Sequence, residues 1–267
     1  MDTSAPTTQA GSEQLLPGQR FIPDLVRQVG EYTLRFARTA ADLDAVCRLR
    51  FQIFNLELGE GLTESFSTGR DEDRFDAQCQ HLMVIHRPNA EVVGTYRLQV
   101  APNAQAGIGF YSAGEFDLSG IPEDVLLQSV ELGRACVARP HRSTKVLLLL
   151  WNGLVEYGLY NGMRHFFGCS SLTSQDPAEG LRCYAQLQSA GHIHPTWRVE
   201  PLPEMTCQVS GAWEAGPAVK IPTLFQIYLK HGAYVLGPPA IDRQFGTIDY
   251  ITWMILDRHI VESFGRR

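Results

Sequence analysis

Charged residues interrupt two segments whose alternating side chains are typical of β-strands. The first covers residues 94–98 (GTYRL) and the second residues 131–137 (ELGRACV). An unpaired charge is costly to bury, so we expect Arg97 to meet either water or a carboxylate. Strict alternation would place Glu131 and Arg134 on opposite faces, but the glycine between them is typical of a bulge. A bulge would bring both charges to one site and separate this strand from its neighbour; an ordinary edge strand is the alternative.

Arg50 and Phe54 lie about one helical turn apart within residues 41–58, where apolar side chains recur every three or four positions. That spacing predicts an amphipathic helix with both residues on a second stripe. The segment that follows is acidic, because residues 57–76 contain seven Asp or Glu residues and two Arg residues. Such a run either forms a solvated loop or binds a cationic small molecule through charge-assisted hydrogen bonds.

A basic segment precedes the helix that we predict over about residues 145–160. Its members are Arg139, His141, Arg142 and Lys145. Ser143 or Thr144 can cap that helix. Free N–H groups at a helix N-terminus suit a phosphate, and the basic side chains add positive charge. A solvated loop is the alternative interpretation.

Other candidates carry a weaker signal. Tyr184 falls in a helix predicted over residues 177–190, where it is either a core phenol or a proton donor. Asp242 and Asp249 flank a Phe-Gly-Thr turn, and they either cap that turn or have a functional role. The six cysteines show no C-x-x-C spacing. This predicts reduced, buried thiols and disfavours zinc, so we expect no bound metal.

The segments above must be positioned by one α+β domain. Its expected order is strand, helix, three strands, helix, strand and helix, followed by further elements. The expected ranges are 32–37, 41–58, 81–86, 92–100, 128–137, 145–160, 166–169 and 177–190, and then 222–231, 233–237 and 249–256. Residues 1–18 are rich in Thr, Ser, Gln, Gly and Pro. We therefore expect a disordered tail over residues 1–18 and a single domain over residues 19–267.

Composition excludes several classes of protein. The chain has 267 residues, 44% of them hydrophobic, and a formal net charge of −6. The hydrophobic fraction supports a sizeable core, and the negative balance argues against a nucleic-acid-binding field over the whole protein. No apolar run approaches the ~20 residues of a membrane span, and the N-terminus lacks signal-peptide features. We expect a cytoplasmic protein, with a peripheral contact with the inner membrane left open.

Taken together and in order, the motifs resemble the bacterial ornithine-lipid N-acyltransferases, which belong to a hemolysin-like branch of the GNAT superfamily. The motifs are LRFQIF (49–54), DEDRFD (71–76), GTYRL (94–98), FYSAGEFD (110–117), ELGRACV (131–137), LLW (149–151) and PPAID…FGT…D (238–249). The resemblance covers about residues 31–256. It implies a GNAT-like mixed, mostly antiparallel sheet flanked by helices, with a splayed or bulged central strand.

The same framework is similar to the acyl-homoserine lactone synthases, which also use acyl-carrier-protein thioesters. The residues that match their pattern are Arg50, Phe54, Asp73, Asp76, Arg97, Glu131 and Arg134. Glu60 stands where those synthases have a Trp, which counts against lactone synthesis. The Gly-rich pyrophosphate loop of acetyl-CoA-using GNAT enzymes is also missing, since residues 138–144 read ARPHRST. This departure argues against free CoA as the donor.

The resemblance implies transfer of a long, 3-hydroxylated acyl chain from acyl carrier protein to the α-amino group of L-ornithine. The product would be a lyso-ornithine lipid, and the acyl carrier protein thioester would be a co-substrate rather than a bound cofactor. Three alternatives remain open. They are N-acylation of another amino acid such as glycine, glutamine or lysine, a lactone-synthase-like signal enzyme, and a non-enzymatic acyl-binding hemolysin-like protein.

The implied chemistry assigns a role to each candidate. An amine that attacks a thioester must first lose a proton, and Glu131 is the expected base. Backbone N–H groups near Cys136 and Val137 would hold the oxyanion, with Cys136 not acting as a nucleophile, and Tyr184 would protonate the leaving thiolate. The expected amino-acid pocket consists of Arg50, Phe54, Asp73, Asp76, Arg97 and Arg134. Within it an aspartate, 73 or 76, would bind the side-chain ammonium and an arginine, 97 or 134, the carboxylate. The carrier protein and its phosphopantetheine would contact Arg139, His141, Arg142 and Lys145.

Overall fold

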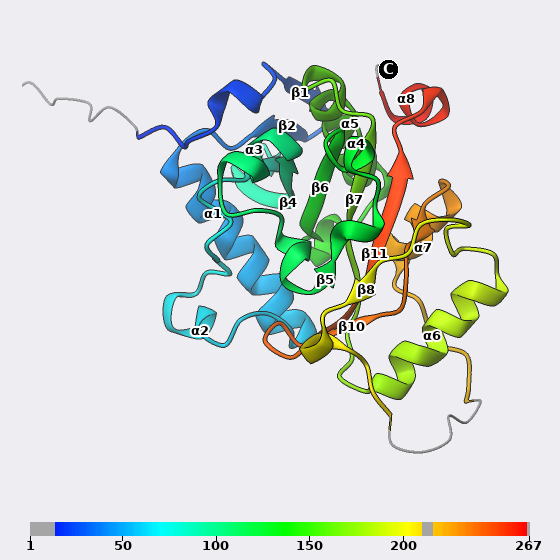
Figure 1. Ribbon diagram of the computed structural model, residues 1–267. Helices are drawn as coiled ribbons and strands as arrows, with labels where there is room; N and C mark the ends of the chain where they lie inside the picture. Colours follow the sequence, from blue (N-terminus) through cyan, green and yellow to red (C-terminus); the bar gives the residue numbers. More distant parts are fainter. Residues whose placement is uncertain (1–13, 210–215, 266–267) are drawn as a thin grey trace, which may run out of the picture.

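A central β-sheet organises the protein, for which a computed structural model describes residues 14–209 and 216–265 (Figure 1). Within these ranges nine strands pair in the order β1-β2-β3-β4-β6-β7-β11-β10, with β9 also paired to β11. Their bounds are β1 Val26–Val29, β2 Tyr32–Phe36, β3 Gln80–His86, β4 Glu91–Val100, β6 Ser129–Val137, β7 His165–Leu172, β9 Tyr234–Val235, β10 Ala240–Asp242 and β11 Thr247–Ile255. Neighbouring strands are antiparallel except for β6 and β7. The expected mixed, mostly antiparallel sheet is confirmed.

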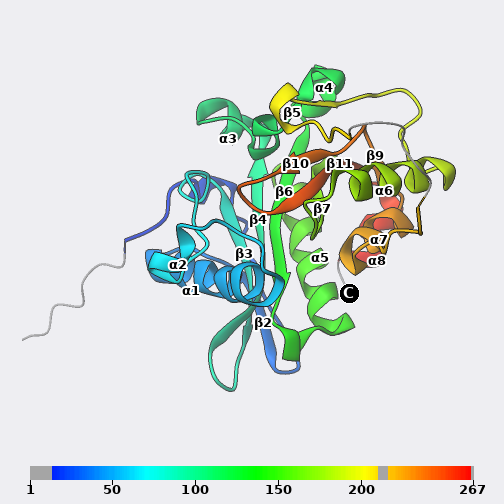
Figure 2. The ribbon, with the colours of Figure 1, turned by 90° about the horizontal axis from the view of Figure 1, so that it is seen from below.

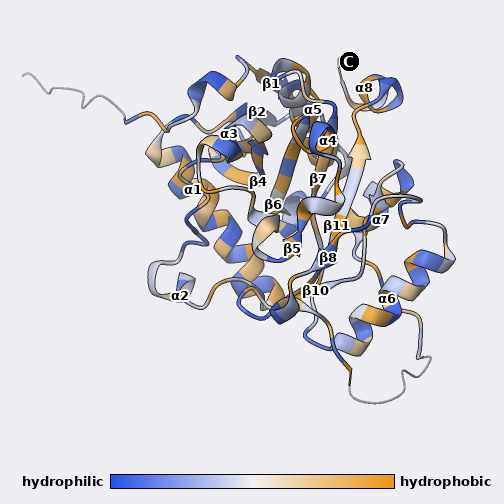
Figure 3. Cartoon of the chain, viewed as in Figure 1, coloured by the Kyte–Doolittle hydropathy of each residue, from blue (hydrophilic) through white to orange (hydrophobic). Residues whose placement is uncertain are grey.

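Helices cover both faces of this sheet. The helix α1 (Ala40–Phe51) contacts β3 and β4 on one face, and α5 (Thr144–Tyr160) contacts β2, β3 and β4 on the other (Figure 2). The other helices are α2 Ser65–Thr68, α3 Ala101–Ala106, α4 Glu123–Leu126, α6 Pro177–Ser189, α7 Thr223–Lys230 and α8 Arg258–Phe264. Apolar and polar residues alternate along α1 and α6, as expected for helices with one buried and one solvated face (Figure 3). A further pair of short strands, β5 (Phe116–Asp117) and β8 (Glu200–Pro201), lies outside the sheet.

The central strand β6 is bulged, as the glycine at position 133 predicts. Arg97 of β4 pairs with Gly133, whereas Thr95 pairs with Cys136, so two residues of β6 oppose one residue of β4. Arg134 at this point has a φ of 47°, in the left-handed region. An extra residue in one strand bends it and turns its side chains, so Glu131 and Arg134 no longer follow strict alternation.

The strands β6 and β7 part immediately before the bulge. They pair only over Ser129–Glu131, opposite His165–Phe167, and then diverge. Gly168 lies at the point of divergence, where an added Cβ would approach the carbonyl oxygen of Leu132 to 2.1 Å. Only a glycine allows this close approach, after which the backbone of β6 is free of β7. The expected splayed strand is therefore confirmed.

Two differences from the sequence expectations concern the first long helix and the N-terminal tail. The helix expected over 41–58 ends as α-helix at Phe51 and continues as a π-helical segment, Gln52–Leu58, a form that often occurs at functional sites. The expected disordered tail falls mainly on residues 1–13, outside the described residues. Residues 14–18 are joined to the domain, because Leu15 bridges Thr39 and the N–H of Leu16 donates to the carbonyl of residue 38. Among the described helices, none has the length and apolar character that crossing a membrane requires.

Candidate active site

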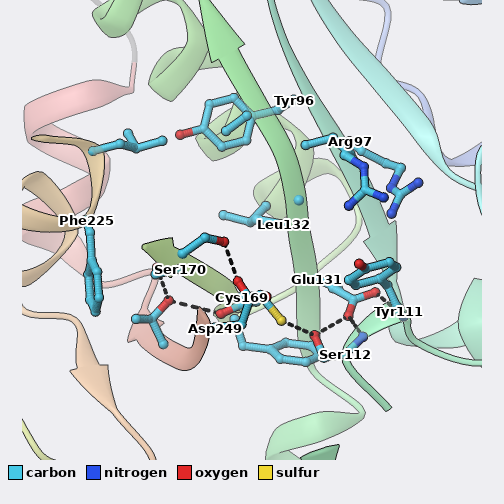
Figure 4. Close-up of a pocket in the computed structure, with 18 of the residues that line it drawn as sticks. Tyr96, Arg97, Tyr111, Ser112, Glu131, Leu132, Cys169, Ser170, Phe225 and Asp249 are labelled. Carbon is cyan, nitrogen blue, oxygen red and sulfur yellow. Dashed lines mark hydrogen bonds between the residues drawn. The ribbon is translucent and has the colours of Figure 1, made fainter. Parts of the chain in front are cut away.

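A cavity of about 320 Å³ opens where β6 leaves β7 (Figure 4). One part of its wall is apolar and comes from β4, β6, β7, α7 and β11. The apolar residues include Leu98, Leu132, Phe166, Leu224, Phe225 and Met254. The opposite part is polar and includes Arg97, Ser112, Glu131, Arg134, Thr173 and Asp249. The cavity can therefore hold an apolar chain and a charged small molecule next to each other.

Glu131 lies at the polar part of the cavity and is held by three hydrogen bonds. Its carboxylate accepts from the backbone N–H of Tyr111 (2.9 Å), the backbone N–H of Ser112 (2.8 Å) and the Ser112 hydroxyl (2.6 Å). Burial raises the pKa of Glu131, while these hydrogen bonds act in the opposite direction. Figure 4 shows Ser112 between Glu131 and Cys169. The group is thus a fixed, partly activated carboxylate in contact with a hydroxyl that also faces the cavity.

Arg50 does not line the cavity but belongs to a buried ion-pair network. Its guanidinium is fully buried and donates to Asp71 (2.7 Å) and to Asp76 (2.7 and 3.1 Å). Neither Arg50 nor Asp76 lines the cavity. The structure therefore does not support the expectation that Arg50 and Asp76 contact the amino acid, because they form an ion pair with each other and neither lines the cavity.

Arg97 and Arg134 complete the ion-pair network at the cavity wall. Arg97 donates to Asp73 at 2.7 Å, and Arg134 donates to Asp73 at 3.0 Å. Both guanidinium groups lie over the ring of Tyr111, at 5.2 and 4.9 Å from its centroid. Both arginines line the cavity, whereas Asp73 does not, and binding of the acceptor by the arginines stays a prediction. Its two arginine partners already neutralise Asp73, so the structure does not leave it available for a substrate ammonium.

Phe54 lines the cavity, and its contact with the substrate stays a prediction. It belongs to the π-helical segment and packs edge-on against Phe245, with ring centroids 5.4 Å apart. The side chain is buried and lines the cavity together with Leu58. Arg50 belongs to the α-helical part and Phe54 to the π-helical part, so the two residues do not share one α-helix.

The expected oxyanion residues do not reach the cavity. Cys136 is buried in an apolar cluster with Leu49 and Ile53, and neither Cys136 nor Val137 lines the cavity. Both pair with β4. The part of β6 that does line the cavity comes earlier in the strand, over residues 131–135. Burial raises the pKa of the Cys136 thiol to about 12, so the thiol stays protonated at neutral pH.

Tyr184 is not brought to the cavity. It lies on α6 and packs against a separate apolar cluster that includes Cys183 and Leu187. Burial raises its pKa, and its charged neighbours are Arg198 and Glu200. The role expected for it as a proton donor is therefore corrected, because the amphipathic helix α6 directs this side chain to its own packing interface.

The basic residues before α5 form a surface outside the cavity. Arg139, Arg142 and Lys145 are exposed. His141 shares a hydrogen bond of 3.0 Å with the hydroxyl of Tyr32, and Arg142 pairs with a glutamate, residue 57, at 2.6 Å. The Ser143 hydroxyl caps α5 as expected, accepting from the N–H of Val146.

Four further buried carboxylates include two that line the cavity, Glu60 and Asp249, and the residue patterns alone do not identify them as a group. They are Glu60, Glu115, Asp242 and Asp249. Burial raises the pKa of Glu60, which accepts a hydrogen bond from Thr173. Burial also raises the pKa of Asp249 to about 6. Oxygens of Glu115, Asp242 and Asp249 lie within 4.8 Å of one another, which suits a cation. Their signal in the sequence is the recurrence of acidic residues in the FYSAGEFD and PPAID…D motifs.

Comparisons with known proteins identify the family of this chain. A model of the acetyltransferase (GNAT) domain matches residues 49–152. The chain is 31% identical to the L-ornithine N(alpha)-acyltransferase of Brucella abortus over 88% of each chain. It is 32% identical to the protein of the same name from Rhodobacter capsulatus, over 84% of this chain and 89% of that one. A solved CoA-dependent acyl-homoserine lactone synthase is 18% identical over 83% of this chain and 79% of that chain, with a TM-score of 0.47. The chain is therefore an acyltransferase that belongs to the L-ornithine N(alpha)-acyltransferase family.

Proposed function

We propose that this enzyme transfers a 3-hydroxy fatty acyl group from an acyl carrier protein thioester to the α-amino group of L-ornithine, giving a lyso-ornithine lipid. The observation that carries the proposal is the cavity at the splay between β6 and β7. It places an apolar wall, which suits an acyl chain, beside a buried carboxylate, which suits an amine. The names of the relatives support ornithine as the acceptor.

In the proposed reaction Glu131 removes a proton from the α-ammonium group, either directly or through the Ser112 hydroxyl. The free amine then attacks the thioester carbonyl carbon, and the C–N bond forms as the carbonyl oxygen becomes an oxyanion. The tetrahedral intermediate loses its second nitrogen proton and expels the pantetheine thiolate, which takes up a proton. The raised pKa of Glu131 makes it a stronger base than an exposed glutamate.

The oxyanion requires donors that are already in place, and we assign this role to backbone N–H groups of β6 between Gly133 and Ala135. This part of the strand lines the cavity and lies beyond the last residue that pairs with β7. Backbone donors that are fixed by the sheet need little reorganisation when the charge develops. Arg97 or Arg134 would bind the carboxylate of the acceptor through guanidinium N–H groups that do not bond to the aspartates, because both line the cavity.

We place the carrier protein on the basic surface before α5. Exposed basic side chains there match the negative charge of a carrier protein and of its phosphopantetheine phosphate. His141 and Arg142 are engaged by neighbours, so we expect Arg139 and Lys145 to carry most of the contact.

The test is a product analysis with purified protein. 3-Hydroxyacyl carrier protein or the matching acyl-CoA is combined with ornithine, lysine, glutamine or glycine, and lipid extracts are analysed by mass spectrometry. We expect N-acylornithine from the carrier-protein donor. Absence of any N-acylated amino acid would contradict the enzymatic role, selective acylation of glycine would overturn the acceptor, and equal rates with acyl-CoA would overturn the donor.

A variant pair tests the docking surface separately. The double substitution Arg139→Gln with Lys145→Gln should raise the KM for acyl carrier protein several-fold, because the steering charge is lost, and leave the KM for ornithine unchanged. Arg258→Gln is the matched control, since its side chain is 90% exposed on α8, at the far end of the chain. An equal effect of both changes would remove the basic surface from the proposal.

A further inference from the structure

Three carboxylates meet at the polar part of the cavity, from segments far apart in the chain. Glu115 follows the turn Tyr111–Gly114, Asp242 ends β10 and Asp249 lies in β11. Their side chains are nearly inaccessible, since the residues are 3%, 6% and 3% exposed, respectively. One oxygen from each lies within 4.8 Å of the others. Of the three, Asp249 lines the cavity, and Glu115 and Asp242 join it from outside the cavity lining (Figure 4).

Neutral groups supply the hydrogen bonds to two of these carboxylates. Asp249 accepts from the hydroxyls of Ser171 and Thr247. One oxygen of Asp242 accepts from the backbone N–H groups of residues 244–245, at 2.8 and 2.9 Å, so the predicted turn cap is present. These donors orient the carboxylates without cancelling their charge. No Lys, Arg or His in the described part of the chain pairs with either one within 4.0 Å.

Glu115 is the least satisfied member of the cluster. One of its oxygens, Oε1, has no hydrogen-bond partner among the described residues, and the other receives a long contact of 3.8 Å from the Cys169 thiol. Arg134 and the Tyr111 phenol both lower the pKa of Glu115. However, the Arg134 guanidinium is paired with two aspartates of the network, and the phenol donates its hydrogen bond to Asp242. A buried carboxylate with an unpartnered oxygen is costly, which points to a ligand that supplies the missing donor.

The electrostatics of the cluster favour binding of a cation. Burial raises the pKa of Glu115 well above its ordinary value, and the neighbouring charges of Asp249 and Asp242 raise it further. Burial also raises the pKa of Asp249, with Asp242 adding to the effect. Ionising all three acids costs both desolvation and mutual repulsion, and a bound cation would lower that cost and favour their charged forms.

Tyr111 connects this cluster to the proposed base. Its backbone N–H donates to Glu131 at 2.9 Å, and its phenol hydroxyl donates to Asp242 at 3.3 Å. The two carboxylate sites are therefore separated by the length of one tyrosine. An amino acid with a second ammonium at the end of its side chain can reach both sites at once.

We propose that Glu115, Asp242 and Asp249 bind the side-chain ammonium of the acceptor and make the enzyme selective for diamino acids. Three N–H donors of an ammonium match three carboxylates, and each contact is a charge-assisted hydrogen bond. The inference rests on the proposed function, because it assigns the second charge of the same acceptor. It replaces Asp73 and Asp76 in this role, since both are neutralised by arginines.

The test compares ornithine with norvaline, which has the same carbon chain and no side-chain ammonium. Values of kcat/KM for both acceptors are measured for the parent, Glu115→Gln and the control Glu123→Gln, whose side chain is exposed on α4. Glu115→Gln should lower kcat/KM for ornithine by roughly ten- to a hundredfold, mainly through KM, because a charged hydrogen bond contributes about 1.5–3 kcal/mol. The value for norvaline and both values for the control should not change.

Equal losses for ornithine and norvaline in Glu115→Gln would overturn the inference and indicate a general structural role. Unchanged ornithine kinetics would also overturn it. Calorimetric binding of ornithine and norvaline to the free protein separates the ammonium site from the proposed acyl transfer. If ornithine binds more tightly than norvaline and Glu115→Gln abolishes this difference, the ammonium site is supported even if no acyl transfer occurs. Stoichiometric divalent metal in the purified protein, with activity lost in EDTA and restored by the metal, would assign the cluster to a metal ion instead.

Discussion

Replacing Asp249 with asparagine should stabilise the free enzyme at neutral pH, although it alters a buried polar group. Asp249 is 3% exposed and lies within 4.8 Å of two other buried carboxylates. Its asparagine variant keeps nearly the same shape and removes one negative charge from the cluster. We expect the sign of the effect on the free energy of unfolding to depend on pH, because the parent carboxylate titrates differently in the folded and unfolded chain.

The magnitude follows from the pKa. Burial raises the pKa of Asp249 to about 6, against an ordinary value of 3.8. Because the pKa is higher in the folded than in the unfolded chain, the contribution of Asp249 to stability is greatest below pH 3.8 and falls as the pH rises to 6. The total loss is about 3 kcal/mol, and about 2 kcal/mol of it develops between pH 4.5 and pH 7. Asparagine abolishes that loss but accepts weaker hydrogen bonds from Ser171 and Thr247, which costs about 1–2 kcal/mol. Since about 1 kcal/mol of the loss has already developed by pH 4.5, the variant should be up to about 1 kcal/mol less stable than the parent at pH 4.5 and about 1–2 kcal/mol more stable at pH 7.

The assay is urea unfolding monitored by tryptophan fluorescence at pH 4.5, 5.5 and 7, without ligand. Asp24→Asn is the control, because it makes the same substitution at a fully exposed carboxylate. Adding ornithine at pH 7 should stabilise the parent more than Asp249→Asn. If the free energies of unfolding of the parent and Asp249→Asn differ by the same amount from pH 4.5 to pH 7, the raised pKa of Asp249 in the folded protein is wrong.

Three more changes test other parts of the site. Arg50→Met should destabilise the fold by about 3–5 kcal/mol in urea unfolding, because two buried aspartates each lose one of their two arginine partners; an unchanged midpoint would contradict the network. Gly168→Ala should lower both the melting temperature and the activity, since its Cβ would lie 2.1 Å from the Leu132 carbonyl oxygen, and a fully active, equally stable variant would disprove the close approach. Glu131→Gln should lower kcat by about 10²–10⁴-fold and remove the fall of kcat/KM at acidic pH, because the raised pKa of the base sets that limb; near-normal turnover at neutral pH would assign the base elsewhere.

Periodicity in the sequence locates most of the elements of this fold. The strands β2, β3, β4 and β6 and the helix α5 agree with the expected ranges within a residue or two. It does not reveal β1, whose side chains are mostly exposed and whose conformation depends on its pairing with β2. The π-helical geometry of Gln52–Leu58 is also absent from the pattern, because α- and π-helices bury nearly the same apolar residues over so short a segment.

For the site, the sequence predicts the bulge but not its exact consequences. Gly133 between two charges is a local signal, so the bulge is visible in one strand alone. The place where β6 leaves β7 depends on Gly168, in another strand, and this moves the part of β6 that faces the cavity from Cys136 to the residues before it. Tertiary contacts also decide whether a charged residue faces the cavity. The spacing of Arg50 in its motif would be the same if it lined the cavity, but its ion pairs with aspartates keep it buried.

The acidic cluster depends even more on tertiary contacts that the sequence pattern does not reveal. Its members come from three segments, and Asp242 alone has a local explanation as a turn cap. Only folding brings Glu115 and Asp249 beside it and leaves an oxygen of Glu115 without a donor among the described residues. No single segment carries that information, whereas the ordered set of motifs does contain all three residues.

The position of the acyl group on the product tests the account most directly. The enzyme is supplied with 3-hydroxyacyl carrier protein and ornithine labelled with ¹⁵N at the side-chain nitrogen, and the product is fragmented by tandem mass spectrometry. If the cluster at Asp249 holds the side-chain ammonium and Glu131 deprotonates the other amine, the acyl group must lie on the unlabelled α-nitrogen. Acylation of the labelled side-chain nitrogen would contradict this orientation and, with it, the assignment of both carboxylate sites.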